Sequence, residues 1–585
     1  KEVKRAHSPV SPLRLTSMET KNIKEELKFL RYFFSYLLTQ KNLVILSVIF
    51  LVGGILSEIS IPLLIRKGAD KVIDTKRFEL LLIYSGAVLL AIIISSINHY
   101  FLIYFTNKVG QNIIYDIRKQ LFSHIIRLPM SFFDKTQSGK LVIRLTNDVE
   151  NLSELFVSGL ITFTADILII AGIITVLFIL NLKLALVSIA VFPIMIIVVI
   201  LFRKKASRIY LEIRRRISEL NSFISESILG IKTIKILPAY SFAIRNFETL
   251  NRKYSEEVEK SIILFALFFS SIIFISSISL GSVMWFGGLK ILEREIGFGT
   301  FLAFWYAVNK LFDPIWDFSE KYNIVQSAIA AAKRIREIFS TPKEYEDRKT
   351  QKPKPKIEKG EIEFKDVWFS YDGKKTVISN VSFKINSGEK VAIVGLTGAG
   401  KTTIANLLTR VYKPQKGKIL IDGKDIDEYE LSELRKSISL IHQDVFIFSR
   451  KVKENITLGE DDDEKMKKIM KILEQIGIEL DIEKEIGEDG AGLSSGEKQI
   501  IATLRALYFD PKIIIFDEAT AFVDPNTEKK INKLIDELFQ GKTIIKIAHR
   551  PETIKTTQRI ILIKKGKVQE LSPKEIKNIE LIYQI

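Results

Sequence analysis

Long, uninterrupted apolar runs fill the first half of the chain, and shorter, strand-like runs fill the second half. A bilayer core of about 30 Å needs roughly 20 apolar residues in a helix, and six runs have about that length. The sixth is more polar than the others. The six runs cover approximately residues 43–65, 80–105, 155–180, 184–202, 262–286 and 301–318. The pattern predicts an all-α membrane domain with six transmembrane helices.

The connections between these runs alternate in length. Short loops join the first to the second, the third to the fourth and the fifth to the sixth, whereas about fifty and sixty residues separate the second from the third and the fourth from the fifth. The long connections contain few Gly or Pro and carry apolar residues at helical spacing, as at Ile113, Ile117 and Leu121. We therefore expect the helices to continue beyond the membrane.

Basic clusters set the expected orientation. Residues 203–205 and 214–216 follow the fourth run and consist of Arg and Lys, which are enriched on the cytoplasmic side. Both long connections and both chain ends are therefore predicted to be cytoplasmic.

Five ionisable residues lie within the apolar runs, where charge is costly and usually faces protein or a water-filled cavity. The alternative is hydrogen bonding between helices, or a place near the membrane surface. These residues are Glu58, His99, Asp166, Lys310 and Asp313.

Composition narrows the class of protein. The chain has 585 residues, of which 47% are hydrophobic and 26% are charged, with a formal net charge of +18 and no cysteine. Disulfides and thiolate metal sites are therefore excluded. In a membrane protein, excess Lys and Arg is explained by cytoplasmic segments beside an anionic leaflet, so we predict no nucleic-acid partner.

The expected domain boundaries follow shifts in composition. Residues 1–22 form a basic tail that we expect to be disordered and not a cleavable signal peptide. The membrane domain is expected over residues 23–340, a charged, Pro-containing linker over 341–358, and an α/β domain over 359–585.

A phosphate-binding loop opens the second domain. An expected buried strand at 389–394 runs into residues 395–403, Gly-Leu-Thr-Gly-Ala-Gly-Lys-Thr-Thr, and an apolar helical pattern follows. The backbone N–H groups of Gly395, Gly398, Ala399, Gly400 and Thr403 are expected around the phosphates. Lys401 reaches the β- and γ-phosphates, and the Thr402 hydroxyl is a ligand for Mg²⁺.

Two further expected strands end in residues whose side chains can bind Mg²⁺, activate water or contact a phosphate. The strand at 513–516 delivers Asp517, a predicted Mg²⁺ ligand, and Glu518, which is placed to activate the attacking water. The strand at 544–548 ends at His549, which either touches the γ-phosphate or is merely structural. Spacing does not decide between those two interpretations.

The segment at 493–499, Leu-Ser-Ser-Gly-Glu-Lys-Gln, resembles the signature motif of ABC ATPases. The resemblance implies that Ser494, Ser495, Gly496 and Glu497 contact nucleotide held by a partner subunit. Further residues match family motifs for adenine stacking, Mg²⁺ binding, dimer crossing and the switch histidine. They are Tyr371, Gln443, Asp524 and His549, in that order.

The membrane half is similar to fused ABC exporters from about residue 22. Residues 131–134 with Gly139 and 144–148 resemble a first intracellular coupling region, and 226–235 a second. Residues 299–300, 314–315 and 331–335 resemble the sixth helix and its exit. The resemblance implies a half-transporter of a prokaryotic inner or cell membrane with ATP and Mg²⁺ as cofactors and a cytoplasmic ATPase domain. Its implied partner is a second half-transporter that pairs head to tail.

Departures from the family pattern bear on that partner. Ser495 replaces the usual Gly, Glu497 replaces the usual Gln, and the loop before Asp524 reads Ala-Phe-Val. A Cβ at position 495 is expected to crowd the approach to phosphate. An intact base with an altered signature favours a heterodimer over a homodimer, and both stay open.

Three functions fit these features. The leading hypothesis is ATP-driven export of an amphipathic or lipid-like substrate, with drug, lipid and peptide all open. The second is an ATP-gated channel or regulatory subunit that closes on ATP without pumping. The third is a soluble ATPase of nucleic-acid metabolism, supported by basicity alone.

Overall fold

The computed structural model describes residues 36–344, 355–460, 462–517, 525–547, 557–564 and 566–571. The chain divides into two compact units. The first holds the described residues up to Ile126 together with Ser138–Thr341, and the second holds Arg127–Gln137 together with the residues from Pro342 onwards. A short piece of the first half of the sequence thus belongs to the second unit.

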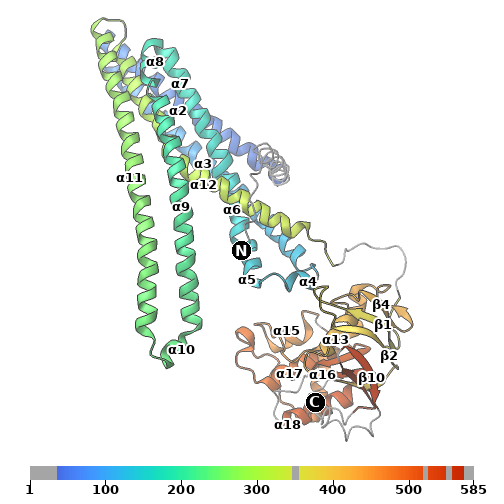
Figure 1. Cartoon of the computed structure of the whole chain (residues 1–585). Helices are drawn as coiled ribbons and strands as arrows, with labels where there is room; N and C mark the ends of the chain where they lie inside the picture. Colours follow the sequence, from blue (N-terminus) through green and yellow to red (C-terminus); the bar gives the residue numbers. More distant parts are fainter. Residues whose placement is uncertain are drawn as a thin grey trace. The chain divides into compact units, whose positions relative to one another are not determined.

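The first unit is all helical (Figure 1), as the apolar pattern predicts. Its elements are α2 (Lys41–Thr75), α3 (Phe78–Ile125), α5 (Ser138–Ile143), the π-helical turns η1 (Arg144–Asp148) and η2 (Leu155–Ile161) with α6 (Val149–Glu154) between them, α7 (Thr162–Leu180), α8 (Leu182–Ile189), α9 (Phe192–Leu229), α10 (Ile231–Ile236), α11 (Tyr240–Leu292) and α12 (Phe298–Ser340).

Five helical stretches among the described residues are long and apolar enough to cross a membrane. They are Lys41–Thr75, Phe78–Ile125, Ser138–Leu180, Leu182–Leu229 and Tyr240–Leu292. The sixth expected run lies in α12, which is more polar. The predicted helical continuation is confirmed, because α3, α9 and α11 extend far past their apolar runs.

The helix α9 runs beside α11, and α10 joins their ends (Figure 1). A core of aliphatic and aromatic side chains from α7, α8, α9, α11 and α12 holds their apolar halves together. The entry to α8 is capped, since the Asn181 side chain accepts a hydrogen bond of 3.0 Å from the backbone N–H of Leu184.

The second unit combines two sheets with short helices. An antiparallel sheet has the order β2 (Ile378–Ile385), β1 (Ile362–Phe369), β4 (Lys416–Ile421), β5 (Lys424–Asp425). The larger sheet has the order β10 (Lys567–Leu571), β9 (Arg559–Lys564), β3 (Lys390–Val394), β8 (Thr543–Ile547), β7 (Ile513–Asp517), β6 (Ile438–Ile441).

Six α-helices, one 3₁₀ turn and α4 complete the described part of the second unit. They are α4 (Met130–Phe133), α13 (Lys401–Leu408), α14 (Leu431–Ser437), α15 (Val452–Thr457), α16 (Asp463–Ile476), η3 (Glu488–Gly490), α17 (Ser495–Tyr508) and α18 (Pro525–Leu538).

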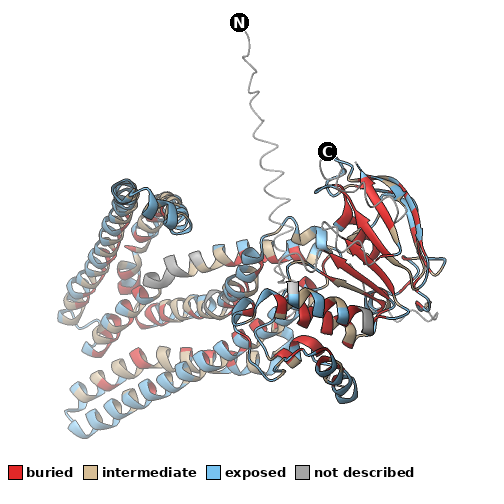
Figure 2. Cartoon of the chain, turned by 90° about the horizontal axis from the view of Figure 1, so that it is seen from below, coloured by how far each residue is buried: buried red, intermediate tan, exposed pale blue. Residues whose placement is uncertain are grey.

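The strands β9, β3, β8, β7 and β6 are parallel, and only β10 is antiparallel to its neighbour. Strands β3, β7 and β8 are buried almost throughout, which explains their continuous Ile and Val runs (Figure 2). In a parallel sheet the carboxyl ends share one edge. The carboxyl ends of β3, β6 and β7 therefore lie at one edge, where the phosphate loop and Asp517 are found.

Candidate active site

The loop after β3 has the backbone that a phosphate site requires. Gly398 and Gly400 have φ values of 79° and 105°, which favour glycine. A Cβ added at Gly395 would lie 2.3 Å from the backbone oxygen of Ile563, so that position cannot carry a side chain without a shift. The loop leads directly into α13, whose first turn points its backbone N–H groups and the positive end of the helix dipole toward the loop.

Lys401 is the first residue of α13 and is only 5% exposed. Its Nζ donates to the backbone oxygens of Gly395 (2.9 Å) and Leu396 (3.2 Å), so the ammonium group closes over the loop. Thr402 beside it is exposed, whereas Thr403 is buried. The loop therefore gathers one cation, a hydroxyl and backbone donors, which is the equipment for binding phosphate.

An aromatic platform stands near this loop. The Tyr371 ring is 48% exposed and packs edge-on against Phe369 (centroids 4.8 Å apart) and Tyr412 (5.0 Å). Its hydroxyl lies 3.1 Å from the Thr403 hydroxyl. Tyr371 is thus tied to the first turn of α13 while its ring stays accessible for stacking on a base.

Asp517 ends β7 and is 7% exposed, so the sheet delivers a nearly buried carboxylate to the edge that carries the loop. Gln443 lies two residues beyond β6, the neighbour of β7. The side-chain amide of Gln499 on α17 donates to the backbone oxygens of His442 (3.1 Å) and Gln443 (3.2 Å). Sequence reasoning missed this role of Gln499, because no spacing rule pairs positions 443 and 499.

The signature segment forms the first turn of α17. Ser494 is the N-cap, and its hydroxyl accepts from the backbone N–H of Glu497 (3.2 Å). The Glu497 carboxylate in turn accepts from the backbone N–H of Ser494 (2.7 Å), which completes a capping box. A Cβ at Gly496 would lie 2.8 Å from Thr527, so glycine is needed where α17 packs on α18.

The two altered signature residues are thereby explained within the chain. The hydrogen bond from the Ser494 backbone holds the pKa of Glu497 below its ordinary value, so this carboxylate stays charged beside the helix N-terminus. Ser495 is exposed and its backbone has no positive φ. Its Cβ therefore strains nothing inside the chain.

Three predicted site residues, Glu518, Asp524 and His549, lie outside the described residues. Within the part of the chain that the structure describes, no three His, Asp or Glu side chains cluster so as to hold a metal ion.

The ionisable residues of the membrane runs differ in their surroundings. Lys310 of α12 lies 3.3 Å from Glu58 of α2 and 3.1 Å from Asp313. Asp166 of α7 pairs with Lys321 of α12, whereas His99 is exposed. Four of the five predicted residues thus belong to ion pairs, and both interhelical pairs join α12 to a neighbouring helix.

The segment Arg127–Gln137 adds a contact that sequence reasoning also missed. The Tyr412 hydroxyl donates to the Asp134 carboxylate at 2.5 Å, and the Glu344 backbone N–H donates to the Arg127 oxygen at 2.8 Å. Burial and the hydrogen bond to Asp134 raise the pKa of Tyr412 above its ordinary value, so its hydroxyl remains a donor at neutral pH.

Fold and site together define a class of protein: a helical membrane unit fused to an α/β ATPase with a phosphate-binding loop. Comparison with protein families narrows that class. The family description "ABC transporter transmembrane region" matches residues 44–315, and "ABC transporter" matches residues 378–521.

Proteins that align with most of this chain support the two family matches. The "Uncharacterized ABC transporter ATP-binding protein YknV" of Bacillus subtilis is 35% identical over 91% of this chain and 89% of its own. The "Probable multidrug resistance ABC transporter ATP-binding/permease protein YheH" of the same organism is 35% identical over 84% and 73%. An "ATP-dependent lipid A-core flippase" of Desulfotalea psychrophila is 31% identical over 89% and 92%.

The chain therefore belongs to the ABC transporter family. It is an ATP-hydrolysing exporter half, integral to the bacterial cell membrane, with its ATPase domain in the cytoplasm. A solved structure titled "Structure of a bacterial Atm1-family ABC exporter with ATP bound" has the same fold, with a TM-score of 0.76 and 23% identity over 93% of this chain and 97% of that one.

Proposed function

We propose that this chain exports an amphipathic, lipid-like substrate by alternating access, as one half of a dimer driven by Mg-ATP. The observation that carries the proposal is the joint presence of a formed phosphate loop and a capped signature helix in one ATPase unit fused to membrane helices. The signature helix of this family meets nucleotide, and the positive end of the α17 dipole suits an anion.

The residue roles in the proposal follow from position. Lys401 and the loop N–H groups anchor the β- and γ-phosphates, and Tyr371 stacks on the base. Glu518, which follows β7 directly in the chain, orients or deprotonates the attacking water. His549 touches the γ-phosphate, and Asp524 reaches across the dimer.

The donor set at the sheet edge fits magnesium. Thr402, Asp517 and Gln443 provide a hydroxyl, a carboxylate and an amide oxygen, and Mg²⁺ prefers oxygen ligands shared with nucleotide phosphates. When bound, the ion neutralises charge on the phosphates. Asp517 is held nearly buried at the end of β7, at the same sheet edge as the phosphate loop.

The partner in the proposal is a second half-transporter that is not identical to this chain. Exporters of this family act as dimers. Ser495 and Glu497 depart from the usual signature while the phosphate loop is complete, so two unequal ATP sites follow when the partner carries the usual signature. Analysis of the purified chain by light scattering tests this: a stable homodimer with robust Mg-ATPase activity would contradict heterodimer formation.

The substrate class rests on relatives and on the membrane unit. The flippase of Desulfotalea psychrophila is named for a lipid, and the YheH protein for multidrug resistance. Lipids and many drugs are amphipathic, and partly exposed ion pairs between membrane helices match a pathway with both polar and apolar walls.

The decisive experiment uses inside-out proteoliposomes containing the chain and its partner. Uphill, ATP-dependent accumulation of a fluorescent lipid is expected. Glu518→Gln is expected to lower the hydrolysis rate by about 10²–10⁴-fold while ATP binding persists. Hydrolysis by this variant at the parental rate would show that Glu518 is not the base.

The same vesicles separate export from the channel alternative. A channel dissipates a gradient and does not build one, so accumulation against the gradient excludes it. If ATP only speeds equilibration, export is the wrong assignment and the gated channel is correct.

A further inference from the structure

A cavity of about 630 Å³ lies in the first unit, where α9 passes α11 and α12. Its two halves differ in chemistry. Val199, Ile200 and Phe202 of α9 with Phe265 of α11 form an apolar half. The next turns of α9 supply the other half, which carries four cations: Arg203, Lys204, Arg208 and Arg214.

The change from apolar to cationic falls at the membrane surface. From Leu184 to Phe202 the chain is apolar for 19 residues, which as helix spans roughly 28 Å, close to the thickness of a bilayer core. Arg203 is the next residue. Since the ATPase end of the chain is cytoplasmic, the cavity straddles the boundary between the cytoplasmic leaflet and its headgroups.

The cations of the cavity differ from their neighbours on α9. Arg215 and Arg216 are neutralised within the helix by Glu212 and Glu219, at distances of 3.0 to 3.8 Å. Those two arginines are not among the cavity-lining residues. The cations of α9 thus fall into two sets. Arg215 and Arg216 are paired with carboxylates of the same helix, and the other set lines the cavity.

No acidic residue is among the lining residues, and within the described part of the chain no carboxylate lies within ion-pair distance of Lys204, Arg208 or Arg214. All three side chains line the same cavity, so their charges lie near one another. Neighbouring uncompensated cations repel one another, and an anion placed among them relieves that repulsion.

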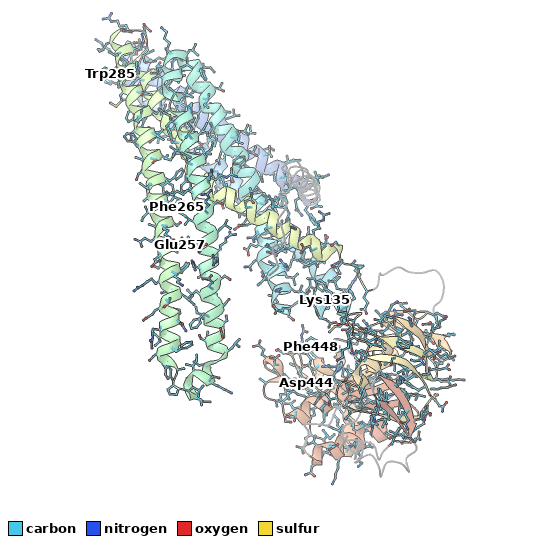
Figure 3. All side chains as sticks on the ribbon, viewed as in Figure 1. Lys135, Glu257, Phe265, Trp285, Asp444 and Phe448 are labelled. Carbon is cyan, nitrogen blue, oxygen red and sulfur yellow. The ribbon has the colours of Figure 1, made fainter. Side chains whose placement is uncertain are left out.

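The apolar half is equally well defined. Phe265 of α11, which is labelled in Figure 3, packs edge-on against Phe202 (centroids 5.2 Å apart) and Tyr210 (6.2 Å) of α9. These contacts form the wall between the two helices. Ile200 and Leu211 also line the cavity and are 59% and 65% exposed. This surface suits a hydrocarbon chain better than water.

We propose that this cavity binds a phospholipid with an anionic headgroup, drawn from the cytoplasmic leaflet. The cations hold the phosphate, and the acyl chains lie along Val199, Ile200 and Phe265. A soluble anion would leave the apolar half uncovered, and a neutral amphiphile would leave Lys204, Arg208 and Arg214 without an opposite charge. The proposal concerns binding alone, so it stands apart from whether the chain pumps and from what it exports.

The test measures lipid binding to the purified full-length protein in mild detergent, by titration with dioleoylphosphatidylglycerol. Near a membrane surface each cation contributes about a five-fold factor in affinity for anionic lipid. The variant Arg208→Gln/Arg214→Gln is therefore expected to bind about 25-fold more weakly. Dioleoylphosphatidylcholine should bind more weakly than the anionic lipid to the parent, and equally to parent and variant.

The control pair Lys205→Gln/Lys253→Gln removes the same charge from exposed positions on α9 and α11 that do not line the cavity. It should change the affinity less than two-fold. Arg208→Lys/Arg214→Lys keeps the charge and should retain binding. Unchanged ATP affinity and elution volume show that each variant is folded, and they do not depend on transport.

Three results would overturn the proposal. One is equal weakening in the control pair, which means a general surface effect. Another is equal affinity of the parent for the two lipids. The third is displacement of bound lipid by millimolar inorganic phosphate, which means that the cations take a free anion and the apolar half is not used.

Discussion

At the scale of single residues, Glu497 has a local role that its position in the signature conceals. Its carboxylate bonds to the backbone N–H of Ser494, and the Ser494 hydroxyl bonds back to the N–H of Glu497. Two N–H groups at the start of α17 are satisfied in this way. The unusual acid therefore stabilises the first turn of the helix that presents the signature.

Replacing Glu497 tests that role. Glu497→Gln retains an oxygen acceptor but loses the charge, so it should destabilise less than Glu497→Ala, which should lower the free energy of unfolding by about 1 kcal/mol. The measurement is thermal unfolding followed by tryptophan fluorescence in detergent. Equal stability of the parent and the Ala variant would contradict the capping role.

The contribution of Glu497 to the free energy of unfolding should depend on pH, in a direction that follows from its lowered pKa. Folding lowers the pKa of Glu497, so its contribution is complete above the unfolded pKa and declines as the pH falls through the folded pKa. The stability difference between the parent and the Ala variant should therefore shrink on acidification and stay constant around neutral pH.

At the scale of elements, α12 is joined to its neighbours by ion pairs at several levels. Near the end of α12, the Arg334 guanidinium donates two hydrogen bonds, of 2.9 and 2.5 Å, to the Asp148 carboxylate. Arg144 donates a third to the same carboxylate at 3.1 Å. The Asp148 side chain is 3% exposed. The turn η1 is thereby tied to the exit of the sixth membrane-domain helix.

Removing the Asp148 charge should loosen that junction. Breaking a buried pair from one side costs about 3–5 kcal/mol, and because Arg334 is 37% exposed we expect less, about 1–3 kcal/mol, for Asp148→Asn. Thermal unfolding of the full chain in detergent measures it. Glu150→Gln, an exposed neighbour, is the control; equal effects in both variants would show that the pair is unimportant.

At the scale of the whole molecule, the segment Arg127–Gln137 connects membrane helices to the ATPase unit by covalent continuity. It follows α3 and precedes α5 in the chain, yet it packs within the second unit, where Asp134 accepts from Tyr412. Tyr412 also packs against Tyr371, the proposed base-stacking residue (5.0 Å). One aromatic side chain thus touches both the nucleotide platform and the connecting segment.

Tyr412→Phe should therefore uncouple hydrolysis from transport. The ring and its packing remain, so basal ATPase activity should stay within about two-fold, while transport per ATP should fall about five-fold for a lost hydrogen bond of about 1 kcal/mol. Asp134→Asn and the double variant complete a double-mutant cycle. Strictly additive losses in that cycle would mean that the two side chains do not act together.

Local patterns in the sequence were sufficient for the elements and for the phosphate loop. Runs of about 20 apolar residues require helices in a bilayer, because no other structure there satisfies the backbone, and glycines at 395, 398 and 400 before Lys401 specify a tight anion-binding turn. The Ile-rich runs at 513–516 and 544–547, the second interrupted by Lys546, likewise predict buried strands.

Contacts between distant positions were decided only by the tertiary structure. Gln499 with Gln443, Tyr412 with Asp134, and the cations of α9 beside Phe265 of α11 are brought together by packing. No periodicity along the chain encodes such pairs, since spacing specifies only which residues share a face of their own element. The sequence by itself determined the kinds of element and the nucleotide chemistry, and the fold determined which side chains meet.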